Sequence, residues 1–350
     1  MTGNPWPPGA ATGVGSMPGT DPLEAAKTVV GELPELPYLP ELPARGLGAD
    51  MIGRTAALLV DLAVEEVTSG YRVAARAGRD QNRAVSLLRT DLDAFEQALE
   101  LAGARPQVIK VQAAGPWTLA AGVELRNGHR VLTDDGAVRE VTASLAEGLA
   151  LHADELARRT GARVVVQLDE PSLPAVLAGR LPTPSGYGTE PAIEDADAQV
   201  GLRTVLDALA GPRIVHCCAA NPPIELLRRA GADALGIDLT LVTGNGRAAA
   251  GAATRTGTVD AIGQAWEDGA TLLLGVVPAT EPDRPVTLRD VARPAFQLAD
   301  RLGFPRATLA QRVVPTPACG LAGATPRWAR RALALVRDTG RAFVEPPEGW

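Results

Sequence analysis

The stretch RIVHCCAANPPIELLRRAGADALGIDL (213–239) contains one complete strand, helix and strand unit. RIVHCC (213–218) and ALGIDL (234–239) are short apolar runs of strand length, and the residues between them have the spacing of an amphipathic helix. A crossover of this kind joins two parallel strands. The stretch therefore predicts a βαβ unit.

The same alternation continues in both directions along the chain. Further strands are predicted at ATGVGS (11–16), ELPYLPEL (35–42), QVIKVQ (107–112), RVVVQLD (163–169), TLLLGVV (271–277) and RVVPT (312–316). Helices are predicted at 21–33, 52–68, 91–103, 136–159, 196–209, 222–230, 258–268, 287–302 and 325–340. About eight such pairs predict an α/β fold of the (β/α)8 TIM barrel type, a single domain over 11–350 after a flexible tail at 1–10. An open doubly wound sheet is the alternative, although GNGRAAAG (244–251) lacks the glycine spacing of its phosphate loop.

Composition excludes several classes of function. The 350 residues carry 41 acids against 34 bases, and a net charge of −7 disfavours nucleic acid and anionic membranes as partners. Three cysteines, two of them adjacent, cannot form a secreted disulfide framework. Neither a signal peptide nor a membrane-length apolar run is visible. We expect a soluble, cytoplasmic protein without nucleic-acid or membrane partners.

A histidine and two cysteines follow predicted strands. His216 and Cys218 are two apart, so on a strand they face the same side, while Cys217 faces the other. Cys319 follows the last strand and would reach the same rim of a barrel. One histidine and two cysteines suit zinc with one position left over. The alternative is that these are small buried residues of the core.

The ligand set points to a reaction class. Two thiolates cancel the charge of the ion, so such a site activates water weakly. A substrate thiol bound there would stay nucleophilic at neutral pH, as alkyl transfer to sulfur requires.

Six motifs carry a resemblance to a known family. They are GVGSMPGT (13–20), GPWTLA (115–120), VVQLDEPSLP (165–174), VHCCAANPP (215–223), ADALGIDL (232–239) and VPTPACGLAG (314–323). In this order they resemble the catalytic barrel of cobalamin-independent methionine synthase, within the superfamily of uroporphyrinogen decarboxylase and the coenzyme M alkyltransferases. The resemblance implies that His216, Cys218 and Cys319 bind zinc. It also places Asp238 where the family has a fourth ligand, a glutamate, and implies that Ser16 and Asp169 hold the carboxylate and amine of homocysteine.

The resemblance has gaps. The family's HGE segment, whose glutamate also contacts the substrate amine, aligns near ARGLGADM (44–51), which has no glutamate. The family's catalytic histidine is not found in GVVPATEP (275–282), and the positions associated with folate are unmatched. No catalytic residue is therefore predicted beyond the metal site.

These observations predict zinc-dependent methyl transfer to a small thiol such as homocysteine, from a methyl donor that could be a corrinoid protein. One alternative is a coenzyme M-type alkyltransferase with a corrinoid or epoxide donor. Another is a zinc-binding barrel without catalysis. Uroporphyrinogen decarboxylation uses no metal and would leave the His216 and Cys218 pair unexplained.

Overall fold

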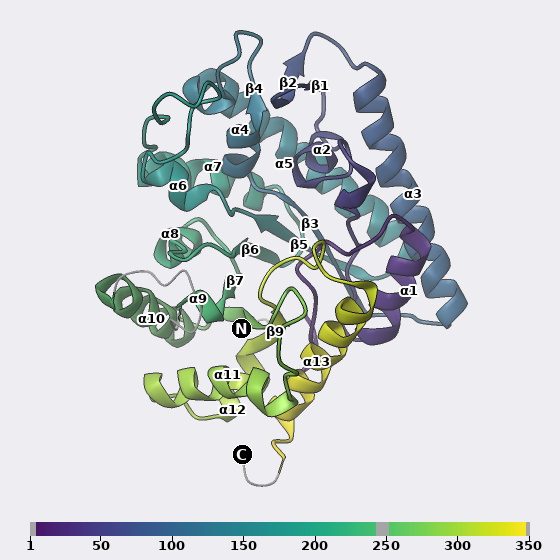
Figure 1. Ribbon diagram of the computed structural model, residues 1–350, viewed down its shortest axis with the longest axis vertical. Coiled ribbons are helices and arrows are strands. Elements are labelled where there is room, and N and C mark those ends of the chain that lie inside the picture. The colour runs from purple at the N-terminus through teal and green to yellow at the C-terminus, as the bar shows by residue number, and fades with distance from the viewer. Residues whose placement is uncertain (1–4, 243–251, 348–350) are drawn as a thin grey trace.

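A curled parallel sheet surrounded by helices forms the framework of the computed structural model, which describes residues 5–242 and 252–347 (Figure 1). Six strands run parallel in the order β3, β5, β6, β7, β8, β9. Their bounds are β3 (Val108–Ala114), β5 (Arg163–Asp169), β6 (Arg213–Cys217), β7 (Ala234–Asp238), β8 (Thr271–Val277) and β9 (Val313–Pro317). All six were predicted, and the mixed α/β class is confirmed.

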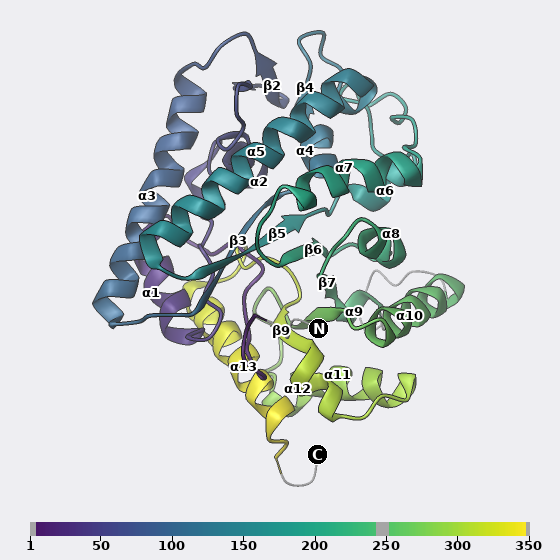
Figure 2. The ribbon, with the colours of Figure 1, turned by 180° about the vertical axis from the view of Figure 1, so that it is seen from behind.

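Helices cover the outside of the sheet, with α1 and α3 on one side of the molecule and α8 and α10 on the other (Figures 1 and 2). The helices are α1 (Pro22–Glu32), α2 (Met51–Ala56), α3 (Arg79–Ala102), α4 (Pro116–Gly122), α5 (Asp135–Thr160), α6 (Leu173–Leu177), α7 (Asp195–Asp207), α8 (Ile224–Arg229), α9 (Leu239–Val242), α10 (Ala252–Glu267), α11 (Leu288–Leu302), α12 (Ala307–Arg312) and α13 (Pro326–Val344), with 3-10 turns η1 (Pro43–Arg45) and η2 (Val131–Thr133). Within the described ranges, no helix has both the length and the apolar character that crossing a bilayer requires.

Two helix starts follow the capping rules. The side chains of Asp21 and Thr325 accept hydrogen bonds from the first backbone N–H groups of α1 and α13, each of which has proline at its first position. Both starts were predicted from these residues.

One predicted helix, 52–68, is wrong beyond its first turn. α2 ends at Ala56, and the chain then forms the antiparallel hairpin β1 (Ala63–Val67) and β2 (Gly70–Ala74), joined in parallel by β4 (Val123–Glu124). β-branched residues and a glycine turn favour a hairpin here. α3 also begins at Arg79, earlier than the predicted residue 91.

Two of the eight predicted strands, 11–16 and 35–42, are not strands of this sheet. They form only isolated parallel bridges, between Ser16 and Glu41 and between Tyr38 and Lys110. Prolines within 35–42 lack the N–H group that a continuous ladder needs, which explains the interruption. The parallel sheet in the described part of the chain therefore has six strands instead of eight.

The core is divided between the two faces of the sheet. The larger cluster packs the helices against the outer face. A smaller cluster takes one residue from each of the six strands together with three residues near the N-terminus: Val108, Val165, Ile214, Ala234, Leu273, Val314, Trp6, Ala10 and Leu36. Trp6 and Ala10 are thus buried, although both fall within the flexible tail expected at 1–10. Residues 1–4 of that tail and residues 243–251 lie outside the described part of the chain.

Candidate functional site

The predicted metal and substrate residues gather at the carboxyl ends of neighbouring strands. Asp169 ends β5, His216 is the penultimate residue of β6, and Asp238 ends β7. β6 lies between β5 and β7, so these three side chains share one edge of the sheet. Cys218 directly follows β6, and Cys319 follows β9 by two residues. This edge is where ligands bind in parallel α/β folds.

His216 is held by the carboxylate of Asp169. The Nδ1 atom of His216 lies 2.7 Å from Oδ1 of Asp169, and both side chains are buried. The ring lies against Gly236 of β7, where an added Cβ would be 2.9 Å from His216 Cδ2. A carboxylate on Nδ1 fixes the ring orientation and leaves Nε2 as the atom for a metal.

The two candidate thiol ligands come from distant parts of the chain and meet. The sulfur atoms of Cys218 and Cys319 are 3.5 Å apart. This thiol contact lowers the pKa of Cys319 to about 6, whereas the same contact and burial raise the pKa of Cys218. Cys217 points to the opposite face, as predicted, and packs in the larger hydrophobic cluster.

The candidate ligand atoms and their spacing can be compared with the coordination that zinc requires. Two sulfurs bound tetrahedrally at about 2.3 Å each lie about 3.8 Å apart, close to the Cys218–Cys319 spacing of 3.5 Å. His216 has the carboxylate partner typical of a metal-bound histidine. Across the described residues, however, no group of three or more histidine, cysteine or acidic side chains is already arranged around one point. The thiol pair and histidine fit zinc, but the full ligand set is not assembled.

Asp238 has a competing local role. Its Oδ1 atom accepts hydrogen bonds from the backbone N and Oγ1 of Thr240, at 2.8 and 2.6 Å, and from Leu241 N at 3.4 Å. These bonds cap the start of α9. Burial raises the pKa of this carboxyl.

Ser16 lies beside the loop that carries Cys319. Leu321 donates its backbone N–H to the carbonyl of Ser16 at 2.9 Å. A Cβ on Gly320 would lie 2.1 Å from Ser16 Oγ, so glycine after Cys319 permits this close approach.

Glu41 lies next to Ser16 and was not among the residues predicted from the sequence. It forms a bridge with Ser16, and the backbone N–H of Met17 donates to the carbonyl of Glu41 at 2.8 Å. Its buried carboxylate accepts a hydrogen bond from Gln112 Nε2 at 3.1 Å. Burial raises the pKa of Glu41 to about 7. A signal was available, because Glu41 stands just before the segment 44–51, which aligns with the family's HGE segment.

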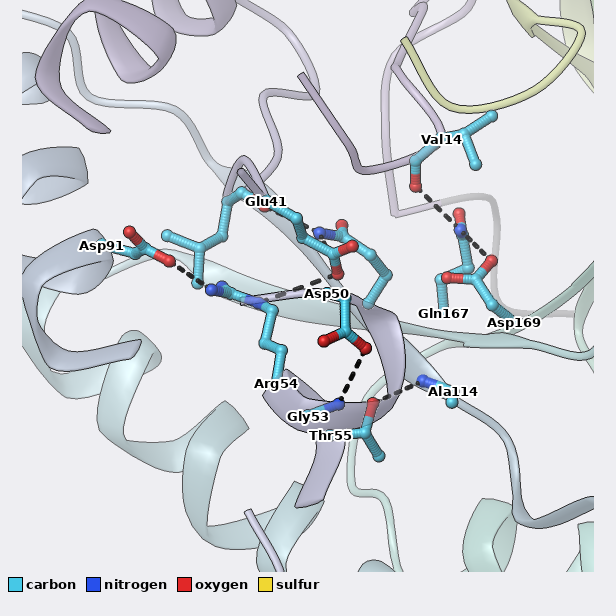
Figure 3. A network of polar contacts seen from close by, with 12 residues as sticks. Val14, Glu41, Asp50, Gly53, Arg54, Thr55, Asp91, Ala114, Gln167 and Asp169 are labelled. Atoms are coloured by element: carbon cyan, nitrogen blue, oxygen red, sulfur yellow. Dashed lines mark hydrogen bonds and ion pairs between the residues drawn. The ribbon is translucent and has the colours of Figure 1, made fainter. Parts of the chain in front are cut away.

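A chain of hydrogen bonds connects Glu41 to His216 through the interior, partly visible in Figure 3. The network passes through buried Lys110, whose Nζ donates to Gln112 Oε1 and to the carbonyl of Val14. Its members, in order, are Glu41, Gln112, Lys110, Val14, Gln167, Asp169 and His216. Burial lowers the pKa of Lys110 to about 8, opposed by the charges of Asp169 and Glu41.

Two neighbours of the site have structural roles. Glu170 caps α4, accepting hydrogen bonds from Trp117 N at 2.9 Å and from Thr118 N at 2.8 Å. Trp117 is buried, and its Nε1 donates to the carbonyl of Ala198, so it fills the core between α4 and α7. Of the two adjacent acids, only Asp169 faces the histidine.

Comparison with known proteins agrees with this architecture. Residues 9–342 match the family model described as the catalytic domain of cobalamin-independent synthase. A B12-independent methionine synthase from Shewanella sp. W3-18-1, in complex with selenomethionine, superposes with a TM-score of 0.60 at 11% identity, over 96% of this chain and 98% of that one. A methyltransferase from Methanosarcina mazei superposes with a TM-score of 0.52 at 16% identity, over 97% and 94%. No curated protein matches the sequence.

Proposed function

The chain belongs to the family of cobalamin-independent synthase catalytic domains, and from this membership we propose that it transfers a methyl group to a small amino-thiol held on zinc. Methyl transfer is the activity that the family and its methyltransferase neighbour support. The zinc and the thiol are our additions. The contact of Cys218 with Cys319 at 3.5 Å, beside a carboxylate-bound His216, carries this proposal.

Zinc bound by Cys218, Cys319 and His216 would supply Lewis acidity that keeps the substrate sulfur ionised at neutral pH. Asp169 holds His216 in a fixed ring orientation through Nδ1. Ser16, beside the Cys319 loop, is the proposed contact for the substrate carboxylate. In this scheme the protein orients the sulfur toward a methyl donor that enters above the strand ends.

The charge of the proposed pocket favours a thiol with an ammonium group. Glu41 and Asp169 are both buried carboxylates on the inner side of the site. Both hydrogen bonds of Asp169 use Oδ1, so Oδ2 is the atom we propose for the substrate amine. Glu41 is the second proposed amine contact, in the role that the resemblance assigns to the glutamate of HGE. An anionic thiol such as coenzyme M would instead be repelled by both groups.

We also propose that segments 11–16 and 35–42 complete a (β/α)8 barrel over 11–350. The bridge between Ser16 and Glu41 joins the two segments, and the bridge between Tyr38 and Lys110 joins the second to β3. The backbone N–H of Thr12 donates to the carbonyl of Pro315 in β9 at 3.3 Å. These contacts support closure of the ring at the point where the six-stranded sheet is open.

The donor and the cellular compartment belong to the same proposal. We expect methyltetrahydrofolate to be a poor donor, because the positions that the resemblance associates with folate are unmatched. Methylcobalamin or a methylated corrinoid protein would take its place, whereas an epoxide would add a hydroxyalkyl group to the thiol and is a donor only for the alkyltransferase alternative. We propose a cytoplasmic location, since the site thiols must stay reduced to bind a metal.

The test begins with metal analysis of protein purified from zinc-supplemented medium. We expect about one zinc per chain, and X-ray absorption should show one additional sulfur ligand when homocysteine is added. A donor panel with homocysteine as acceptor then tests turnover. Zinc with a new sulfur ligand but no methylated product from any donor would favour the non-catalytic alternative. Protein without zinc would refute the proposal.

A further inference from the structure

Arg54 of α2 lies behind Glu41, on the side away from Asp169, as Figure 3 shows. Its Nε is 3.8 Å from Glu41 Oε1, and its guanidinium also contacts the carboxylate of Asp91 in α3. Arg54 is 4% exposed and Asp91 is 2% exposed. A buried arginine between two carboxylates is held by its charge as well as by packing.

The helix that carries Arg54 is fixed at both ends. Asp50 caps α2 by accepting hydrogen bonds from Ile52 N and Gly53 N at 3.0 and 3.2 Å. Near the other end, Thr55 Oγ1 accepts a hydrogen bond from Ala114 N, at the end of β3, at 2.8 Å. Arg54 is therefore tied to the strand that also carries Gln112, the hydrogen-bond donor to Glu41.

The charged side chains of Arg54 and its neighbours have a net positive charge, which lies next to Glu41. Arg45 donates to Asp91 Oδ2 at 2.8 Å from the far side. Two arginines and one aspartate amount to one net positive charge. Because that charge is buried next to Glu41, it favours the ionised form of this carboxyl.

The other groups that face Glu41 do not replace Arg54. Asp169 of β5 is negatively charged and opposes the ionisation of Glu41. Tyr38, which lies in the same segment as Glu41, carries no positive charge. Lys110 of β3 is positive, but its ammonium is bonded to Val14 and Gln112 and also compensates Asp169. Among the charged groups, Arg54 has the largest effect in lowering the pKa of Glu41.

We propose that Arg54 is a positioning residue that favours the ionised form of Glu41 and holds its carboxylate in place, and thereby makes the site specific for thiols that carry an ammonium group. This rests on the proposed function, because it takes Glu41 as an amine contact. Nothing in the role requires Arg54 to touch the substrate.

The test compares two thiols that differ only in the amine, L-homocysteine and 4-mercaptobutanoate, by calorimetry on the zinc-loaded protein. At pH 7, Arg54→Met should weaken homocysteine binding by about tenfold or more and leave mercaptobutanoate binding within about threefold. Homocysteine binding to Arg54→Met should recover as the pH is raised, because Glu41 then ionises without help. Arg54→Lys should restore most of the affinity at pH 7.

Arg72→Met is the matched control, since it removes a partly buried arginine from its salt bridge with Glu124 and does not act on Glu41. It should change homocysteine affinity by less than about threefold. Equal loss for both thiols in Arg54→Met, or no loss, would overturn the proposal. If Arg54→Met does not fold, Arg54→Gln and Arg54→Lys provide the same comparison. Wild-type protein that binds neither thiol would contradict the proposed function, whereas equal affinity for both would contradict the role given to Glu41 and Arg54.

Discussion

Asp169 Oδ1 and His216 Nδ1 are 2.7 Å apart, and this contact joins the last residue of β5 to the neighbouring strand β6. Gln167 donates to the same oxygen from Nε2 at 2.8 Å, which fixes the carboxylate from behind. Asp169 thus supports the proposed metal ligand His216 and is also part of the proposed amine site.

Replacing Asp169 with asparagine should therefore weaken zinc binding before any substrate is added. Loss of a carboxylate partner to a ligand histidine typically lowers metal affinity by about 10- to 100-fold. Chelator competition measures this directly. Glu170→Gln is the control, because the carboxylate of Glu170 is equally buried but binds α4 instead of the His216 ring, and the variant keeps the backbone bond from Glu170 N to the carbonyl of His216. Unchanged zinc affinity in Asp169→Asn would show that the histidine does not need this partner.

The three cysteines should separate into two classes. Cys218→Ser or Cys319→Ser should abolish zinc retention, because a hydroxyl is a much poorer zinc ligand than a thiolate. Cys217→Ser should retain the metal, since Cys217 packs on the helix side of β6. Metal content after gel filtration distinguishes the classes. Retention of zinc by either of the first two variants would contradict the ligand assignment.

Glu41 should make stability depend on pH. Burial raises its folded-state pKa from 4.5 to about 7, so between these values the folded chain binds more protons than the unfolded chain. The contribution of Glu41 to stability is then fully present below about pH 4.5 and is lost as the pH rises to about 7. Glu41→Gln should gain about 3 kcal/mol relative to wild type across this interval. Urea unfolding of both proteins at several pH values checks this, and parallel curves would mean that Glu41 is not perturbed.

The strand residues of the site were predictable because their position follows from the pattern of buried strands. His216 and Cys218 had to share a face at spacing two, and the carboxyl ends of parallel strands meet at one edge. The same rule places Cys319 at this edge, but it does not predict the contact with Cys218, because β7 and β8 lie between β6 and β9.

Glu41 and Arg54 were not predictable from local pattern. Glu41 lies in a segment that prolines prevent from forming a continuous strand, so its register against Ser16 depends on one isolated bridge. The sequence predicts that Arg54 belongs to a long helix over 52–68, where an arginine is normally solvated. Only the short α2 and its neighbour Asp91 on α3 explain why a charge is buried there. These contacts join segments that are distant in sequence.

The last prediction concerns Asp238, because its carboxylate is both a candidate zinc ligand and the cap of helix α9. Aspartate reaches about 1.5 Å less far than the glutamate of the family, while zinc–oxygen bonds must close to about 2.0–2.2 Å. In the structure, Oδ1 of Asp238 is already bonded to Thr240 and Leu241. We therefore expect Asp238→Ala to lower zinc affinity by only about 10- to 100-fold, whereas Cys319→Ser removes the metal.

Stability should respond differently from metal affinity. Loss of the cap on α9 should cost about 1 kcal/mol in Asp238→Ala, measured by denaturant unfolding of the metal-free protein. Asp238→Asn keeps an oxygen at the cap and should retain most of that stability, while it tests the need for a charged ligand. If both variants lose zinc as completely as Cys319→Ser, then the carboxylate binds the metal directly and leaves its bonds with Thr240 to do so.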